Sequence, residues 1–532
     1  MRLKMCSYYK RLISCFVMMI LLMTVCGARL FVISTDKKLA EAAAAQSTRK
    51  FSVATVRGTV YDCLGRPLTD TSERPVTVIM PTEQGLQTAA KLMDEDALAD
   101  AYKKLGNGNP VVLGRECPVG LAGTVCFHVP VRYSGTLRHV LGYLDGTSHG
   151  VSGIEKYFDD VLFPKQNLGI TYTVSSSGRI LAGDGWKITP AGGAGNVTLT
   201  IDADAQRITE EAMSGVDAGA AVIIDASSGA VRAMVSRPLF DQNNVADSVS
   251  DEKAAPLINR ALFAYNVGSV FKPCVAAAAI ETGNADYTYT CEGSFEHSGL
   301  TFRCNSRSGH GTLGLGEALE KSCNTYFYTL ALKIGAEKIY DYANSFKFGS
   351  ALQLGGGIVS QSGSMPYKDI LTEQTAALIN LSIGQGDLLL SPTAISCMYA
   401  AIVNGGSYHS PYIVEKWEKD GDVTCPERLP VITALKKETA DLLTQYLESA
   451  LKDGTGKAAY IEGVTAGGKT GTAQTGWKDG DRNILNGWFC GFLKGAQTDY
   501  VCVILKEDVK SGSADCAPIF REITEKLIET GK

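Results

Sequence analysis

The most informative part of the chain opens with Val267-Gly-Ser-Val-Phe-Lys272 and continues through a run of alanines to Ile280. Its glycine predicts a turn, and the alanine-rich run predicts a helix that ends before Gly283. Ser269 would then lie at the helix N-terminus, with Lys272 one turn later on the same face. A hydroxyl needs a base to become a nucleophile, and a desolvated lysine can serve as one. On this stretch alone, a serine that merely caps the helix is an equally good interpretation.

Two short motifs follow downstream. Ser322-Cys-Asn324 comes after a second predicted helical stretch and, by itself, is ordinary loop chemistry. Lys469-Thr-Gly471 lies in a strand-like run, where a lysine and a threonine side by side can bind a carboxylate and a glycine lets a substrate backbone lie close. The ordered set SxxK, SxN and KTG is far more specific than any one motif, and it is the set of serine β-lactamases and penicillin-binding proteins.

The elements around these motifs predict the fold class. A β-hairpin is expected before Ser269, helices are expected from Ser269 to about Leu451, and an amphipathic helix over Ile519–Ile528 follows the last strands. Strands at both ends of a domain with helices between them predict an α+β sheet with a helical insertion. The strand-like runs are Ala221–Asp225, Ala230–Val235, Ala466–Thr475, Gly487–Leu493 and Tyr500–Leu505.

On these motifs the chain resembles a class B penicillin-binding protein, a monofunctional peptidoglycan D,D-transpeptidase, over most of residues 52–532. The resemblance implies a serine β-lactamase/transpeptidase-like domain, a smaller N-terminal pedestal domain and one transmembrane helix. Two departures are visible, because Val267 replaces the usual proline and Val270 the usual threonine. Further stretches that match the family are Arg57–Asp62, His139–Tyr143, Gly153–Glu155, Asn259–Ala261, Ile383–Gly386, Asn404–Gly406, Gly454–Gly456, Gly468–Gln474 and Trp488–Phe489.

The resemblance implies acyl transfer through a serine ester. Ser269 would attack the carbonyl of the penultimate D-Ala of a stem peptide that ends in D-Ala-D-Ala, with Lys272 as general base. Ser322 would relay the proton to the departing D-Ala amine, and Asn324 would hold the substrate amide and Lys272. An amine of a neighbouring stem peptide would then accept the acyl group, and β-lactams would acylate the same serine.

Substrate binding is assigned to the KTG strand by the same resemblance. Lys469 and Thr470 would bind the terminal carboxylate of the stem peptide, and Gly471 would give its backbone room. The backbone N–H groups of Ser269 and Thr472 would form the oxyanion hole. No metal or organic cofactor is expected.

Three rival functions use the same domain. A D,D-carboxypeptidase would have the same residues with water as acceptor. A β-lactamase would need a deacylating glutamate of the ExxLN type, and none is found between Asn324 and Lys469. The third rival is a non-catalytic β-lactam sensor or a catalytically silent scaffold that uses the domain for binding alone. The single span argues against a multi-span transducer, and the intact Ser269, Lys272 and Lys469 argue against a silent scaffold. Division, elongation and sporulation all stay open as the setting.

The first 35 residues predict a membrane anchor. The apolar run Leu12–Ile33 would span about 33 Å as a helix, enough for one bilayer crossing. A cleaved signal peptide is the alternative, but the small-residue stretch Ala42–Ala45 lies far beyond the apolar run. We expect a single-pass cell-membrane protein with a cytoplasmic N-terminus and an extracytoplasmic catalytic domain, because positive charges precede the run. These are Arg2, Lys4, Lys10 and Arg11.

Three segments are therefore predicted. Residues 1–35 form the cytoplasmic tail and anchor, residues 36–195 the N-terminal pedestal domain and linker, and residues 196–532 the penicillin-binding transpeptidase domain. Within the pedestal we expect strands, one helix over Leu86–Leu105, and a Ser/Gly-rich loop or linker over residues 173–196. The resemblance implies membrane lipid and a polytopic membrane glycosyltransferase as partners.

Composition excludes other classes of protein. The 532 residues carry 51 Lys+Arg against 56 Asp+Glu, a net charge of −5, so no nucleic-acid partner is expected. Six histidines without HExxH, and no close Cys/His pairs such as CxxC, predict no standard zinc site.

Two patterns imitate other catalytic motifs. Gly463–Thr470 satisfies the P-loop pattern, but the residues that follow are poor material for the helix that a P-loop must open. Gly146–Gly150 matches the GxSxG nucleophile elbow, but no helix is predicted to begin at Ser148, which falls in the smaller domain. We expect no nucleotide site, and a surface turn at Ser148.

Disulfides can form among the cysteines that lie outside the membrane. Cys6, Cys15 and Cys26 lie before or in the apolar run, which leaves twelve of the 15 cysteines outside. Most of these look like small core residues, but Cys291 and Cys304 bracket a polar stretch, and a bond between them would close a 14-residue loop. Such a bond would contribute about 3 kcal/mol. We predict this disulfide, with two buried thiols as the alternative.

Overall fold

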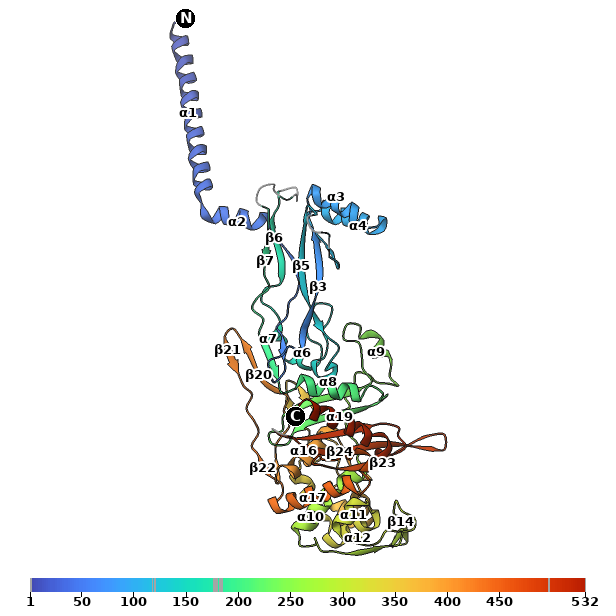
Figure 1. Ribbon diagram of the computed structural model, residues 1–532. Helices are drawn as coiled ribbons and strands as arrows, with labels where there is room; N and C mark the ends of the chain where they lie inside the picture. Colours follow the sequence, from blue (N-terminus) through green and yellow to red (C-terminus); the bar gives the residue numbers. More distant parts are fainter. Residues whose placement is uncertain are drawn as a thin grey trace. The chain divides into compact units, whose positions relative to one another are not determined.

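The computed structural model describes residues 2–116, 118, 121–175, 180, 185–495 and 498–531. The chain forms two compact units, each built from separated segments (Figure 1). The first unit comprises Met1–Val56, Glu73–Pro130 and Pro164–Gly192, and the second comprises Arg57–Ser72, Val131–Phe163 and Gly193–Lys532. The units therefore differ from the predicted division at residue 195, because residues 57–72 and 131–163 pack with the second unit.

The N-terminal helix α1 (Arg2–Thr35) contains the candidate membrane span. Its part Tyr8–Thr35 has 28 residues and a mean hydropathy of 2.4, and none of its most apolar window is buried against the rest of the chain. A helix that is apolar all round and unburied needs lipid to cover it. The predicted apolar helix is thus present as a candidate membrane span that begins four residues earlier than the sequence indicated, and α2 (Lys37–Ser47) follows it.

The first unit is built on two three-stranded sheets. One has the order β1 (Thr48–Ala54), β6 (Leu168–Thr173), β7 (Trp186–Thr189), and the other β4 (Val111–Leu113), β3 (Thr69–Ile79), β5 (Thr124–Tyr133). The core between them consists of Val76, Val78, Met80, Phe127, Val129, Ile170, Tyr172 and Val174.

Two predictions for this unit are wrong. The helix expected over Leu86–Leu105 is two helices, α3 (Glu83–Leu92) and α4 (Glu95–Gly106), because the Asp94 carboxylate accepts the N–H of Ala97 and caps a new helix. The loop or linker expected over residues 173–196 contains β7, which pairs antiparallel with β6 inside the unit. Residues 176–179 and 181–184 of that segment lie outside the described residues.

The second unit is organised around a five-stranded antiparallel sheet. Its order is β10 (Val231–Arg237), β9 (Gly219–Asp225), β25 (Asp499–Lys506), β24 (Arg482–Lys494), β23 (Ala466–Asp479). The hairpin and the three later strands predicted from the sequence are confirmed, and so is the fold class. Alternate residues of β9 enter two cores, with Val222 on one face and Ile223 on the other.

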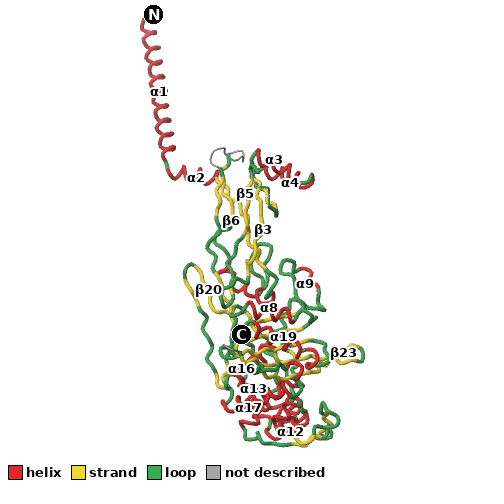
Figure 2. The backbone as a smooth tube through the Cα atoms, viewed as in Figure 1, coloured by secondary structure: helices red, strands yellow, loops and turns green. Residues whose placement is uncertain are grey.

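Helices cover both faces of this sheet. The face that carries Ile223 packs against α8 (Ala203–Ala212) and α19 (Ala517–Glu529), where Phe489 of β24 meets Phe520 with ring centroids 4.6 Å apart. The face that carries Val222 packs against α16 (Pro392–Val403), and the helical insertion is built around α10, which contacts α12, α13 and α17 (Figure 2). Its helices are α10 (Lys272–Glu281), α11 (Leu315–Glu320), α12 (Asn324–Ile334), α13 (Ala336–Ser345), α14 (Lys368–Glu373), α15 (Thr375–Leu381), α16 and α17 (Lys437–Lys452).

Short elements complete the second unit. A four-stranded sheet has the order β2 (Val60–Tyr61), β8 (Asn196–Leu199), β20 (Val414–Lys419), β21 (Asp422–Thr424). The remaining pairs are β11 (Tyr265–Asn266) with β18 (Leu389–Leu390), β12 (Tyr289–Cys291) with β15 (Gly311–Leu313), β13 (Ser294–His297) with β14 (Leu300–Arg303), β16 (Gln353–Gly355) with β17 (Ile358–Val359), and β19 (Ser407–Tyr408) with β22 (Ile432–Thr433). The short helices are α5 (Arg138–Leu141), α6 (Gly153–Tyr157), α7 (Asp159–Leu162), α9 (Ala246–Ser250), α18 (Gly512–Asp515) and the 3-10 turns η1 (Gly268–Phe271) and η2 (Lys457–Ala459).

Candidate active site

Ser269 lies in the 3-10 turn η1, which leads directly into α10 at Lys272. The turn depends on Gly268, whose φ is +62° and whose N–H donates to the carbonyl of Gly384 over 2.8 Å. A Cβ at Gly268 would also lie 2.9 Å from the carbonyl oxygen of Thr472. Glycine is therefore required here, and it lets the serine turn approach the KTG strand while Ser269 itself stays half-buried.

Lys272 is fully buried and all its polar contacts are with the SxN motif. Its Nζ lies 2.8 Å from the Ser322 carbonyl oxygen, 2.7 Å from Asn324 Oδ1 and 3.2 Å from Ser322 Oγ. Burial lowers the pKa of this amine to about 7, so a large share of Lys272 is neutral near neutral pH. The Ser322 carbonyl and Asn324 Oδ1 can only accept, so each receives an N–H of this amine in either of its protonation states.

The SxN motif forms the junction between α11 and α12. Ser322 is buried with a φ of +55°. This left-handed conformation costs a serine about 1–3 kcal/mol and persists only where the surrounding structure imposes it. Cys323 is the N-cap residue of α12, and Asn324 is the first residue of that helix. The backbone N–H of Cys323 donates to the Ala318 carbonyl over 2.9 Å, which ties the junction to α11.

Lys469 and Thr470 point from β23 toward Thr455. Lys469 Nζ donates to Thr455 Oγ1 over 3.2 Å, and Thr470 Oγ1 donates to the same oxygen over 2.9 Å. Lys469 is fully buried, and both burial and the charge of Lys272 hold its pKa well below the usual range. A carboxylate that entered this site would be stabilised by the ammonium form and by the Thr470 hydroxyl.

The next two residues of β23 contact the segments beside the strand. A Cβ at Gly471 would lie 2.9 Å from Val270 Cγ1 and 3.0 Å from the Val267 carbonyl oxygen. The glycine therefore gives room to the serine turn. Thr472 is exposed, and its Oγ1 accepts the N–H of Gly512 over 3.1 Å.

The structure thus brings Lys272, Ser322 and Asn324 into contact at the start of α10, and β23 packs against η1, the turn that carries Ser269. Thr455 belongs to the same site, although the sequence assigned it no role. Its hydroxyl receives both Lys469 and Thr470, and its carbonyl accepts the hydroxyl of Ser513 over 2.8 Å. The only sequence signal was the Gly454–Gly456 stretch that matches the family.

Neither of the two patterns that resemble other catalytic motifs lies in the structural context that its motif requires. The P-loop pattern Gly463–Thr470 continues into β23 where a P-loop would begin a helix, so no nucleotide site forms. Ser148 has a φ of +67° in a turn, and its carbonyl accepts Arg57 Nη1 over 2.8 Å. Its segment packs with the second unit and not with the smaller one as predicted.

The predicted Cys291–Cys304 disulfide is wrong. Both residues are free thiols, buried as the alternative interpretation proposed. Cys304 Sγ lies instead 3.8 Å from Cys323 Sγ and 3.5 Å from His310 Nδ1.

Comparison with known proteins identifies the family of this chain. The family described as "Penicillin binding protein transpeptidase domain" matches residues 219–525, more than half of the chain. The chain belongs to this family. Within this penicillin-binding protein family, curated relatives include class B enzymes, so the predicted resemblance is confirmed.

Two relatives and two solved structures show what this penicillin-binding protein is similar to. Stage V sporulation protein D of Bacillus subtilis is 26% identical over 521 residues, which is 89% of this chain and 78% of that protein. Peptidoglycan D,D-transpeptidase PbpA of Mycobacterium tuberculosis is 30% identical over 370 residues, which is 63% of this chain and 73% of that protein. Penicillin binding protein 3 of Mycobacterium tuberculosis, solved with aztreonam, is similar at 23% identity and a TM-score of 0.66 over 91% of this chain and 97% of that chain. PBP2 of Helicobacter pylori, solved with MreC, is similar at 21% identity and a TM-score of 0.66 over 91% of this chain and 99% of that chain. At these identities the two structures establish the fold alone.

Proposed function

We propose that this chain is a serine-type D-Ala-D-Ala transpeptidase that cross-links peptidoglycan stem peptides and that β-lactams acylate. The observation that carries the proposal is Lys272, a fully buried amine that follows the Ser269 turn and is held by Ser322 and Asn324. A buried amine of lowered pKa is the base that a serine nucleophile needs. Membership of the family and relatives named peptidoglycan D,D-transpeptidases support it.

Acylation begins with the removal of the Ser269 proton by neutral Lys272. The serine oxygen attacks the carbonyl of the penultimate D-Ala, and the bond to the terminal D-Ala nitrogen breaks. The proton returns to that nitrogen through Ser322, whose hydroxyl lies against Lys272 Nζ. The backbone N–H groups of Ser269 and Thr472 face the oxygen on which negative charge develops.

The carboxylate of the terminal D-Ala binds at Lys469 and Thr470. In the free protein these two groups share the Thr455 hydroxyl, so Thr455 holds the pair in place until the carboxylate arrives. An acceptor amine then attacks the carbonyl of the acyl-enzyme, which releases Ser269 and forms the cross-link. Water as the acceptor would make the same site a carboxypeptidase.

The proposal includes the setting of the enzyme. Helix α1 anchors the chain in the cell membrane with its N-terminus in the cytoplasm, following the positive charges before the apolar run. The catalytic domain then lies outside the cytoplasm with its substrate, and the two three-stranded sheets of the first unit form the pedestal. Membrane lipid and a polytopic membrane glycosyltransferase are its partners, and the solved complex of PBP2 with MreC is a precedent for partner binding in this fold.

The experiment is labelling of the full-length protein in detergent with a fluorescent penicillin, followed by mapping of the labelled peptide. We expect one adduct on Ser269, no labelling of Ser269→Ala, and unchanged labelling of the matched control Ser148→Ala. Label that survives in Ser269→Ala, or that maps to Ser148, would refute the assignment. With lipid-linked substrate, a cross-linked product supports the transpeptidase, whereas release of D-Ala without cross-links would identify a carboxypeptidase.

A further inference from the structure

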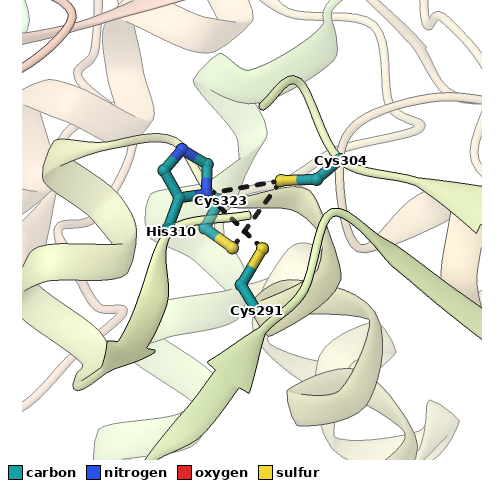
Figure 3. Close-up of side chains that lie close together, drawn as sticks. All are labelled: Cys291, Cys304, His310 and Cys323. Carbon is teal, nitrogen blue, oxygen red and sulfur yellow. Dashed lines mark hydrogen bonds between the residues drawn. The ribbon is translucent and has the colours of Figure 1, made fainter. Parts of the chain in front are cut away.

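Four side chains beside the proposed active site converge on one point (Figure 3). The Sγ atoms of Cys291, Cys304 and Cys323 and the Nδ1 atom of His310 all lie within 4.8 Å of one another. The three cysteines are buried and the histidine is half-buried. They come from four separate elements: the end of β12, the residue after β14, the residue before β15, and the N-cap of α12.

The distances fit a tetrahedral metal site. Zinc lies about 2.3 Å from thiolate sulfur and about 2.0–2.1 Å from imidazole nitrogen, so a tetrahedron has S···S edges of about 3.8 Å and S···N edges of about 3.5 Å. Cys304 Sγ lies 3.8 Å from Cys323 Sγ, and His310 Nδ1 lies 3.5 Å from Cys304 Sγ and 3.6 Å from Cys291 Sγ. A disulfide would need about 2.05 Å between sulfurs.

Backbone contacts hold the four groups at these distances. Cys291 pairs with Gly311 across β12 and β15, and the neighbouring His310 N–H donates to the Cys291 carbonyl over 3.1 Å. Gly309 has a φ of +79°, and a Cβ there would lie 2.1 Å from the same carbonyl oxygen. The loop between Cys304 and His310 therefore closes tightly on β12 only because glycine stands at this position.

The β-ribbon between two of the cysteines has no core of its own. The strands β13 and β14, which lie between Cys291 and Cys304, have no fully buried residue. A ribbon without a core of its own needs another source of stability, such as a disulfide or a metal.

We propose that Cys291, Cys304, His310 and Cys323 bind one Zn²⁺ ion. Three cysteines and one histidine are a standard ligand set for tetrahedral structural zinc, and soft thiolates select zinc over Mg²⁺ or Ca²⁺. Each thiol gives up its proton when it binds, so uptake of the metal releases protons to solvent. All four positions are filled by the protein, which leaves none for substrate, so the ion is structural.

The zinc site would also fix the SxN motif, a consequence that rests on the proposed function. Cys323 lies between Ser322 and Asn324, the two residues that hold Lys272. A metal bond to Cys323 constrains the backbone on both sides of it, including Ser322 in its left-handed conformation. The ion is thereby a positioning element for the proposed general base.

The test is the metal content of the full-length protein purified in detergent with a thiol reductant. We expect elemental mass spectrometry to find about one zinc per chain, because the site has a single tetrahedral ligand set. Cys304→Ser and His310→Ala should lose the metal, whereas Cys397→Ser, a buried cysteine outside the cluster, should keep it. His310→Cys preserves four ligands and should therefore bind the metal. This variant separates loss of a ligand from poor folding of His310→Ala.

A second readout uses cobalt in place of zinc. Cobalt uptake should give the thiolate charge-transfer and intense visible bands of a tetrahedral site, absent in Cys304→Ser. Wild-type protein that takes up neither metal, metal retained by both ligand variants, or a Cys291–Cys304 disulfide in non-reduced peptides would each overturn the proposal. Zinc found in a protein that penicillin does not acylate would refute the proposed function and leave the metal site standing, and acylation without zinc would do the reverse.

Discussion

The charge on Lys272 decides whether Ser269 can be activated. Burial disfavours the ammonium form and lowers its pKa to about 7, although three oxygens surround the nitrogen. Two of these oxygens can only accept, so each holds an N–H of the amine whether or not the amine is charged. The contacts that fix the side chain therefore persist when Lys272 loses its proton.

Penicillin acylation should accordingly rise with pH. Below about pH 7 the neutral fraction of Lys272 falls about tenfold for each pH unit, so the second-order acylation rate should fall with it and reach a plateau above about pH 8. Stopped-flow measurements with a fluorescent penicillin, with circular dichroism to show that the fold is intact at each pH, provide the test. A rate that is flat between pH 5.5 and pH 8.5, values chosen to bracket a base of about this pKa, would remove Lys272 as the base.

The variant Lys272→Arg is the matched control for this pH dependence. It keeps the positive charge and the donors, but a guanidinium cannot lose its proton in a protein. Acylation should fall about 10²–10⁴-fold and lose its midpoint near pH 7. Unimpaired acylation would show that the lysine positions Ser322 and Asn324 without acting as a base.

Sequence order predicted most of this site but not all of it. Ser269, Lys272 and Lys469 were found because each lies in a short motif, and the order of the motifs carries the information. Thr455 could not be assigned, because a lone threonine between glycines has no signature until β23 lies beside it. The cluster of Cys291, Cys304, His310 and Cys323 escaped for the same reason: 12, 5 and 12 residues separate its members, and no two are close in the chain.

At the scale of elements, β23 does two things at once. The strand carries Lys469 and Thr470, which belong to the site, and its Gly471 packs closely against the turn that carries Ser269. The nucleophile and the proposed carboxylate site are thus fixed to each other through a single strand. A change at that contact should move the serine without touching any group that reacts.

Gly471→Ala tests this contact. Its Cβ would lie 2.9 Å from Val270 Cγ1, so the turn must shift, at a cost of about 1–3 kcal/mol in the free energy of unfolding. Displacement of the nucleophile should lower the acylation rate, by up to about 10²-fold for a shift of 1 Å. Penicillin labelling kinetics and urea unfolding measure the two effects.

Gly215→Ala is the control, because nothing lies within 4 Å of the Cβ that it would add. It should leave both the unfolding free energy and the acylation rate near their wild-type values. Equal behaviour of Gly471→Ala and Gly215→Ala would mean that the turn is positioned by something other than β23.

Element boundaries were predicted well where pattern and packing agree. The strands β9, β10, β24 and β25 are apolar on both faces because helices cover both sides of the sheet, and such runs are easy to recognise. The break between α3 and α4 was missed because Asp94 was not recognised as a cap. Strand β7 was missed because its Trp186–Thr189 is short and stands in a Ser/Gly-rich segment.

At the scale of the whole molecule, the proposed setting of the catalytic unit depends on the apolar helix α1. This helix has an unburied apolar surface, and its four early basic residues predict which end stays in the cytoplasm. In the proposed setting, the domain that binds stem peptides follows the helix on the outer side. The exposed cysteines make this orientation measurable, because Cys126 and Cys425 are exposed and lie beyond the span, whereas Cys6 precedes it.

We expect a membrane-impermeant maleimide to label Cys126 and Cys425 in intact spheroplasts, because both would lie on the outer side. The variant that combines Cys126→Ser with Cys425→Ser should lose most of this label, while Cys6 should react only after the membrane is permeabilised. Mass spectrometry of the labelled peptides identifies each site. Buried thiols, including the zinc ligands, should react only when the protein is denatured and the metal chelated. Labelling of Cys6 in intact spheroplasts, with Cys425 protected, would show the opposite orientation. The catalytic domain would then lie in the cytoplasm, apart from peptidoglycan, and the proposed setting would be refuted.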